Sequence, residues 1–202
     1  MDFKMHGRKY VLALLLAGLA SSSIAAVQLS KEQGDAFERK IGEIAKNGSS
    51  NPVQSKKTLI SEREVASYLA FNGKDKIPRG LANPEISMRG NGNLAGRVFV
   101  DIDEFKRQRG SGGFVDPLNY VSGQVPLTAW GILTSRDGRG QFQLGSAEIL
   151  GIPLPKPIVQ ELVSFFSRTP EYPRGFNIDE PFNLPAKIRQ VAVNQGESLI
   201  VQ

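Results

Sequence analysis

The side chains most suggestive of chemistry are the carboxylates of the segment Val100-Asp101-Ile102-Asp103-Glu104. If this segment is a strand, Asp101 and Asp103 project from the same face, because side chains alternate along a strand with a period of two. Two carboxylates on one face could bridge a hard cation such as Ca²⁺. The alternative interpretation is that they are solvent-facing strand residues beside Lys106 and Arg107.

Other catalytic groups are scarce. The 202 residues include no Cys and a single His, His6, which lies in a segment that we expect to be removed. The mature chain would then be unable to form a Ser-His-Asp triad, a Cys-His pair or a His/Cys zinc site. An enzyme would need carboxylates facing each other across a cleft, and the candidates are Asp101, Asp103, Glu104 and Glu148. We expect neither a metal nor a cofactor.

Residues 1–26 are typical of a secretory signal. They begin with basic residues, continue with an apolar run over residues 10–20, and end with small residues. The run is shorter than the roughly 20 apolar residues that span a bilayer core. We therefore expect cleavage near Ala25 or Ala26 and an exported protein, periplasmic or extracellular, with a retained anchor as the alternative.

Removal of this segment also changes the charge. It takes away Asp2, Lys4, Arg8 and Lys9, which leaves 25 − 3 basic and 20 − 1 acidic residues, so the formal net charge falls from +5 to +3. A nucleic-acid-binding domain normally carries a concentrated basic footprint. A charge this mild predicts no nucleic-acid partner.

A polar segment, residues 27–57, precedes a single domain that we expect over residues 58–202. The segment contains a weakly amphipathic helix over residues 30–46 and a linker-like stretch rich in Gly, Ser, Asn and Pro. We interpret it as an N-terminal arm and linker, and as a candidate contact surface for an envelope protein.

The sequence predicts an α+β fold for this domain. Ser61 and Glu64 form a capping-box pair before an apolar-periodic run, which predicts a short helix. An apolar helix begins at Pro157, which is acceptable in the first turn. Strands are predicted over residues 84–89, 94–103, 124–135 and 141–150, with further extended segments after residue 175. Strands close in sequence pair as hairpins, so we expect an antiparallel sheet with helices against one face.

The apolar residues of the helix and the second hairpin form either a closed core or the two walls of a groove. The helix would supply Ile158, Leu162, Phe165 and Phe166. The sheet would supply Leu127, Trp130, Ile132, Phe142 and Leu144. A small domain needs most of its apolar area for stability, which favours the closed core in the absence of further information.

A basic stretch is predicted to run into a flexible, Gly-rich loop. Lys106, Arg107 and Arg109 precede Gly110-Ser111-Gly112-Gly113. Such residues could attract anionic headgroups at a membrane surface, at about 1 kcal/mol per charge. The alternative is a solvated face without a partner.

The order of these segments resembles the LmeA-like phospholipid-binding proteins. The resemblance rests on residues 60–65, Val98-Phe99-Val100-Asp101, Asp137-Gly138, residues 151–155 and Leu184-Pro185, and it covers roughly residues 58–202. It implies an exported bacterial protein with half of a tubular lipid-binding fold, in which a curved antiparallel sheet surrounds one main amphipathic helix and leaves an apolar groove for acyl chains. No catalytic residues come with it.

Three functions remain open at this point. The first is an exported, non-enzymatic envelope protein that binds phospholipid, or a membrane surface, through the groove and the basic residues. The second is an envelope scaffold or partner-binding module with a closed core. The third is a carboxylate-based enzyme acting on glycans.

Overall fold

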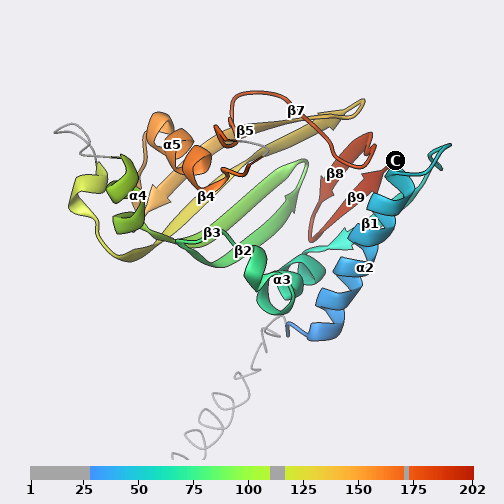
Figure 1. Cartoon of the computed structure of the whole chain (residues 1–202), viewed down its shortest axis with the longest axis horizontal. Helices are drawn as coiled ribbons and strands as arrows, with labels where there is room; N and C mark the ends of the chain where they lie inside the picture. Colours follow the sequence, from blue (N-terminus) through green and yellow to red (C-terminus); the bar gives the residue numbers. More distant parts are fainter. Residues whose placement is uncertain (1–27, 110–116, 171–172) are drawn as a thin grey trace, which may run out of the picture.

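The computed structural model describes residues 28–109, 117–170 and 173–202, and it contains helices together with two antiparallel sheets (Figure 1). The predicted α+β class with long antiparallel hairpins is confirmed, although the larger sheet is not strongly curled. The predicted signal and the Gly-rich loop at residues 110–113 lie outside the described residues. Within the described ranges, no helix is long and apolar enough to cross a membrane.

The larger sheet has six strands: four form the two predicted hairpins, and two are short strands of two residues each. Its strand order is β2-β3-β4-β5-β6, with β7 paired to β5, so β2 is an edge strand. Within the described residues this edge is free apart from an isolated bridge between Arg89 and Gln195. The strands are β2 (Leu81–Gly90), β3 (Asn93–Asp101), β4 (Gln124–Arg136), β5 (Arg139–Ile149), β6 (Ile152–Pro153) and β7 (Phe182–Asn183).

The smaller sheet joins the first strand of the described chain, which follows α2 in the sequence, to the last two strands. Its order is β1 (Lys57–Ser61), β9 (Glu197–Val201) and β8 (Gln190–Asn194). This sheet meets the tips of the large hairpins, since the Gly92 N–H donates to the Val193 carbonyl at 3.2 Å and the Gly138 N–H donates to the Arg189 carbonyl at 2.9 Å. The two sheets are therefore connected by backbone hydrogen bonds.

Two of the four described α-helices, α2 (Lys31–Gly48) and α3 (Glu62–Phe71), pack beside the smaller sheet. The predicted capping box starts α3: the Glu64 N–H donates to Ser61 Oγ at 3.2 Å, and the Ser61 N–H donates to Glu64 Oε2 at 2.9 Å. The other two, α4 (Ile102–Arg109) and α5 (Lys156–Phe166), contact β4 and β5 of the larger sheet.

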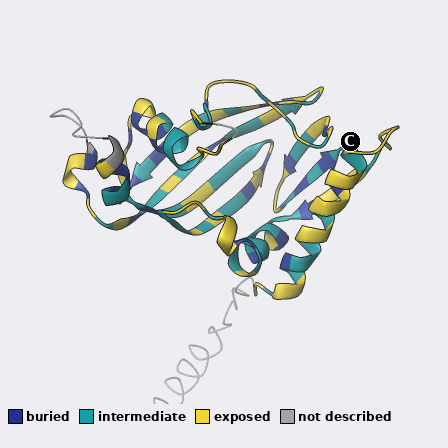
Figure 2. Ribbon diagram, in the orientation of Figure 1, coloured by how far each residue is buried: buried dark blue, intermediate teal, exposed yellow. Residues whose placement is uncertain are grey.

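The buried side chains form two cores. The first lies between α4, α5 and one face of the larger sheet, and it includes Val100, Ile102, Phe105, Val125, Ile149, Val159 and Leu162. The second lies between α2, the smaller sheet and the segment before β8, and its buried members are Ile44, Ile60, Ile188 and Ile200. The predicted arm thus contributes Ile44 to a core, while the outward side of α2 stays exposed (Figure 2).

Candidate functional site

Most of the predicted groove residues meet in the first core. Ile158 and Leu162 are 9% and 3% exposed, and Leu127, Leu144, Phe165 and Phe166 pack against the same buried cluster. The rings of Phe165 and Phe166 lie 4.8 Å apart, edge to face. Side chains from α5 and from the sheet therefore contact one another over this part of the predicted groove.

The other predicted groove residues lie elsewhere. Phe142 lies over Gly131, where a Cβ would stand 2.4 Å from its ring, and it is not among the residues packed on the core. Val125, Leu127 and Ala129 face that core, so alternation along β4 places Trp130 and Ile132 on the opposite face. The structure does not bring these two residues to α5.

The predicted basic loop is helical up to Arg109. Lys106 is half-buried, and its Nζ donates to the Val121 carbonyl at 2.6 Å. Arg107 pairs with Glu104 one helical turn earlier, and this hydrogen bond raises the pKa of the Arg107 guanidinium above its ordinary value. Lys106 and Arg107 are thus engaged within the protein, and the predicted role of all three residues in binding headgroups stays a prediction.

The interpretation of Asp101 and Asp103 as strand neighbours was wrong, because β3 ends at Asp101 and α4 begins at Ile102. Asp101 Oδ1 accepts the Glu104 N–H at 2.9 Å, as a helix N-cap does. Asp103 Oδ2 accepts the Gly123 N–H at 2.9 Å. Both carboxylates bind backbone groups, and the described ranges contain no cluster of His, Cys, Asp or Glu that could hold a metal.

A groove of about 880 Å³ lies between α3, the turn η1 (Lys74–Lys76) and the free edge of β2. One side is a single face of α3, and the other is the edge strand. Most lining residues are apolar: Leu29, Ala66, Leu69, Ala70, Ile77, Pro78, Leu81, Ala82, Pro84 and Ile86. On the α3 side, the small side chains of Ala66 and Ala70 leave space in the groove.

Glu62 attaches α3 to β2 at one end of the groove. Its carboxylate accepts the Met88 N–H at 2.6 Å, while the Met88 carbonyl accepts the Gly196 N–H at 2.8 Å. Both peptide groups of Met88 therefore point away from β3. Alternation directs the peptide groups of Ile86 to the same free edge, and Pro84 has no N–H to offer there.

Two cations stand toward the other end, where η1 leads into β2. Lys74 and Arg79 line the groove and are exposed, and within the described ranges neither side chain forms a hydrogen bond or an ion pair. Lys76 differs, since its Nζ donates to the Tyr68 hydroxyl at 2.8 Å, which raises the pKa of Lys76. The acidic groups at the groove are Glu62, already hydrogen-bonded, and Glu85, opposite Arg97 in the strand register.

This groove was not predicted from the sequence, although two local signals point to it. Ala66 and Ala70 leave a low surface on one side of a short helix, and Pro84 marks an edge strand because it cannot donate to a neighbouring strand. Neither signal indicates that α3 lies beside β2, which depends on contacts between different parts of the chain.

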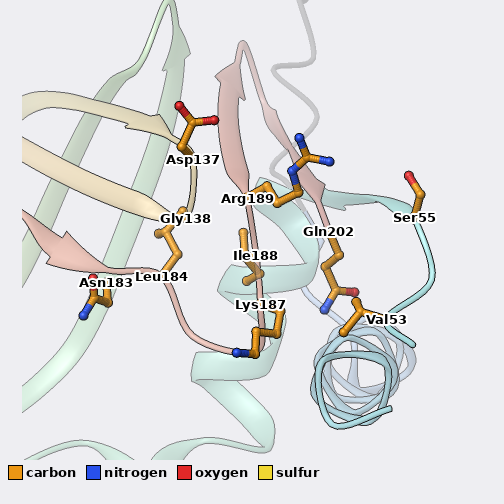
Figure 3. A pocket seen from close by; sticks show the side chains of 10 residues that line it. All are labelled: Val53, Ser55, Asp137, Gly138, Asn183, Leu184, Lys187, Ile188, Arg189 and Gln202. Atoms are coloured by element: carbon orange, nitrogen blue, oxygen red, sulfur yellow. The ribbon is translucent and has the colours of Figure 1, made fainter. Parts of the chain in front are cut away.

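A second cavity, of about 630 Å³, lies between the β4–β5 turn and the segment that leads into β8 (Figure 3). Ala186 and Lys187 have φ of 50° and 56°, a left-handed backbone that is unusual for residues other than Gly. The Gln202 side chain holds this segment, because Nε2 donates to the carbonyls of Ala186 and Ile44 at 2.6 and 2.9 Å. The geometry of this cavity therefore depends on Gln202.

Comparisons with protein-family models, with curated proteins and with solved structures found no match for this chain. The resemblance to the LmeA-like proteins consequently rests on the sequence segments alone. The candidate site is defined by its own geometry: an apolar groove with two cations, Lys74 and Arg79, that have no partner among the described residues.

Proposed function

We propose that this chain is an exported, non-enzymatic protein of the bacterial cell envelope that binds an anionic lipid between α3 and β2. The observation that carries the proposal is the groove of about 880 Å³, with apolar walls and with Lys74 and Arg79 unpaired within the described residues. Its volume lies in the range of about 300–1,000 Å³ that is typical of small-molecule sites.

The proposed ligand matches the groove in two parts. Each acyl methylene removed from water contributes about 0.8 kcal/mol, so about ten of them contribute about 8 kcal/mol before the loss of ligand freedom is subtracted. A phosphate or carboxylate headgroup would accept hydrogen bonds from Lys74 and Arg79. These hydrogen bonds are stronger than neutral ones because both donor and acceptor are charged. The peptide groups of Ile86, which point away from β3, provide polar contacts for an ester or carboxyl group of the bound lipid.

The non-enzymatic part of the proposal is supported by the carboxylates. Asp101 and Asp103 accept backbone N–H groups at the start of α4 and at Gly123, which gives them structural roles. The segment expected to remain after cleavage carries neither His nor Cys.

Lipid binding is tested on protein purified after expression of the full chain. Mass spectrometry of organic extracts is expected to find a co-purified anionic lipid. Fluorescent fatty acid is expected to bind and to be displaced by phosphatidylglycerol. Extracts without lipid, together with no uptake of the fluorescent fatty acid, would contradict the proposal.

Two variants locate the site. Ala66→Trp fills the groove from α3, and the double charge reversal Lys74→Glu, Arg79→Glu opposes an anionic headgroup. Each is expected to weaken fatty-acid binding about tenfold or more, since 1.4 kcal/mol corresponds to a factor of ten. The double reversal Arg136→Glu, Arg139→Glu is the matched charge control, because both residues are exposed and face each other at the tip of the β4–β5 hairpin. Equal weakening by this control would indicate a general charge effect.

Export is tested by the mass of the protein recovered from the cell envelope. Cleavage after Ala25 or Ala26 would remove the apolar run and leave a chain that begins at Ala26 or Val27. Intact-mass measurement and N-terminal sequencing distinguish this outcome from an uncleaved chain. Recovery of uncleaved protein from membranes would favour the retained anchor.

A second candidate function is binding to an extended segment of another envelope protein. The free edge of β2 favours it, because unpaired peptide groups at a sheet edge can accept an added strand. A photo-crosslinking residue at Ser87, which lines the groove, would then capture a protein partner. Capture of a protein combined with lipid-free extracts would favour this second function.

A further inference from the structure

The most exposed aromatic ring of the larger sheet belongs to Trp130, on the face opposite α5. The residue is 44% exposed, although a Trp contributes stability when it is buried. Its indole lies on Gly145, because a Cβ at position 145 would stand 2.5–2.6 Å from the ring atoms Cη2, Cζ2 and Cε2. Its partners in the strand register are the small residues Ala95 and Ser146. One indole face therefore rests on the backbone, and both register partners of the residue are small.

Polar side chains surround the indole. A shallow cavity of about 270 Å³ beside it is lined by Arg89, Thr128, Ser146 and Glu148. Within the described ranges, none of these four side chains forms a hydrogen bond or an ion pair. Together they offer guanidinium and hydroxyl donors and carboxylate and hydroxyl acceptors around a flat apolar ring.

The charges around Trp130 select among ligands. Arg89 and Glu148 line the same cavity with charges of opposite sign, so each disfavours a ligand of its own sign and neither a cation nor a polyanion is favoured above the indole. The Arg97 guanidinium, opposite Thr128 in the register, lies over the Phe99 ring, 5.3 Å from its centroid. A neutral ligand with many hydroxyl groups and one flat apolar face avoids both penalties.

We propose that this face of the sheet binds a β-linked glycan chain, with one sugar ring stacked on Trp130. In a β-linked glucose or N-acetylglucosamine chain the ring substituents are equatorial, so the C–H groups form a flat apolar face and the hydroxyls point outward. The C–H face matches the indole, and the hydroxyls reach Arg89, Thr128, Ser146 and Glu148. An extended, flat chain also suits a sheet that is not strongly curled.

Trp130 is the sole tryptophan in the chain, so intrinsic fluorescence reports directly on this site. Titration of the full protein with chitohexaose and with cellohexaose is expected to give a saturable change in emission for at least one of them. Maltohexaose, whose α-linkages curve the chain, is expected to give none. No change with either β-linked probe overturns the proposal, and an equal response to maltohexaose overturns the assignment to a β-linked chain.

Variants are compared by calorimetric titration with the β-linked probe that binds, since Trp130→Ala has no fluorescent reporter. Trp130→Ala is expected to weaken binding about tenfold. Gly145→Ala is expected to weaken it as well by displacing the indole, and its thermal midpoint reports whether the fold is retained. Leu59→Ala, an exposed apolar truncation in the smaller sheet, is the control and should bind as the unaltered protein does. Unchanged affinity in Trp130→Ala overturns the proposal.

Discussion

Replacing Phe105 by Ala is expected to lower the free energy of unfolding by about 3–5 kcal/mol, the usual cost of removing a buried Phe ring. Phe105 is 2% exposed, and its ring centroid lies 5.3 Å from that of Phe165 and 6.4 Å from that of Phe166. The truncation would leave a cavity where α4 meets α5. Urea denaturation followed by circular dichroism measures the loss.

Two further variants keep this expectation testable if Phe105→Ala does not fold. Phe105→Leu removes fewer atoms and is expected to cost less than the alanine variant does. Tyr120→Ala truncates an aromatic ring that is 84% exposed, so it should change stability by no more than about 0.5 kcal/mol. Losses of similar size in Phe105→Leu and Tyr120→Ala would show that α4 does not support the first core.

The helix that carries Phe105 was not predicted from the sequence, which instead indicated a strand up to Asp103. Alternation of apolar residues along β3 continues from Val98 through Val100 to Ile102, so the pattern predicts a strand up to Asp103. The strand ends at Asp101 because that carboxylate caps the helix that follows. Ile102 is still buried, but in α4, so hydrophobic alternation alone could not detect the change of element.

Local signals gave correct predictions where the interaction itself is local. Ser61 and Glu64 are three residues apart and form their capping box as expected, and Asp137-Gly138 turns the second hairpin. The pairing of β1 with β9 could not be predicted in this way, because it joins residues near Thr58 to residues near Ile200.

The candidate sites depend even more on long-range placement. Trp130 lies on a strand with apolar residues on both faces, so alternation did not show which face meets α5. The α3–β2 groove depends on Glu62 reaching the Met88 N–H in another element. Trp130 could therefore be predicted from the sequence as a candidate site residue, but its environment could not. Lys74 and Arg79 were not predicted as site residues.

Glu64 is expected to contribute strongly to the packing of α2, α3 and β1. Glu64 is 5% exposed. Its carboxylate accepts hydrogen bonds from Lys40 Nζ at 2.7 and 2.8 Å and another from the Ser61 N–H. Glu64→Ala would leave Ser61 and Lys40 without this acceptor and is expected to cost about 2–3 kcal/mol. This expected cost is smaller than that of breaking a fully buried ion pair, because the Lys40 side chain is 35% exposed and partly solvated.

The charge of Glu64 makes part of this stability dependent on pH. Burial by itself raises the pKa of the carboxyl, but the hydrogen bond and charge of Lys40 and the Ser61 N–H outweigh burial and hold the pKa below 4.5. Since the unfolded chain binds the proton more readily, the contribution is present above about pH 4.5 and is lost as the pH falls through the lower, folded-state pKa. The unaltered protein should therefore lose stability below this pH more steeply than Glu64→Gln does.

Urea denaturation at a series of pH values measures both curves, and their difference isolates Glu64. The pKa values of Asp35 and Glu43 are also lowered, by hydrogen bonds from Asn72 and Lys56 respectively. These groups titrate in both proteins and cancel in the difference. Parallel curves would mean that Lys40 does not stabilise the ionised carboxyl. The contacts between α2 and α3 would then depend on apolar packing such as that of Phe37 on Tyr68, whose ring centroids lie 4.8 Å apart.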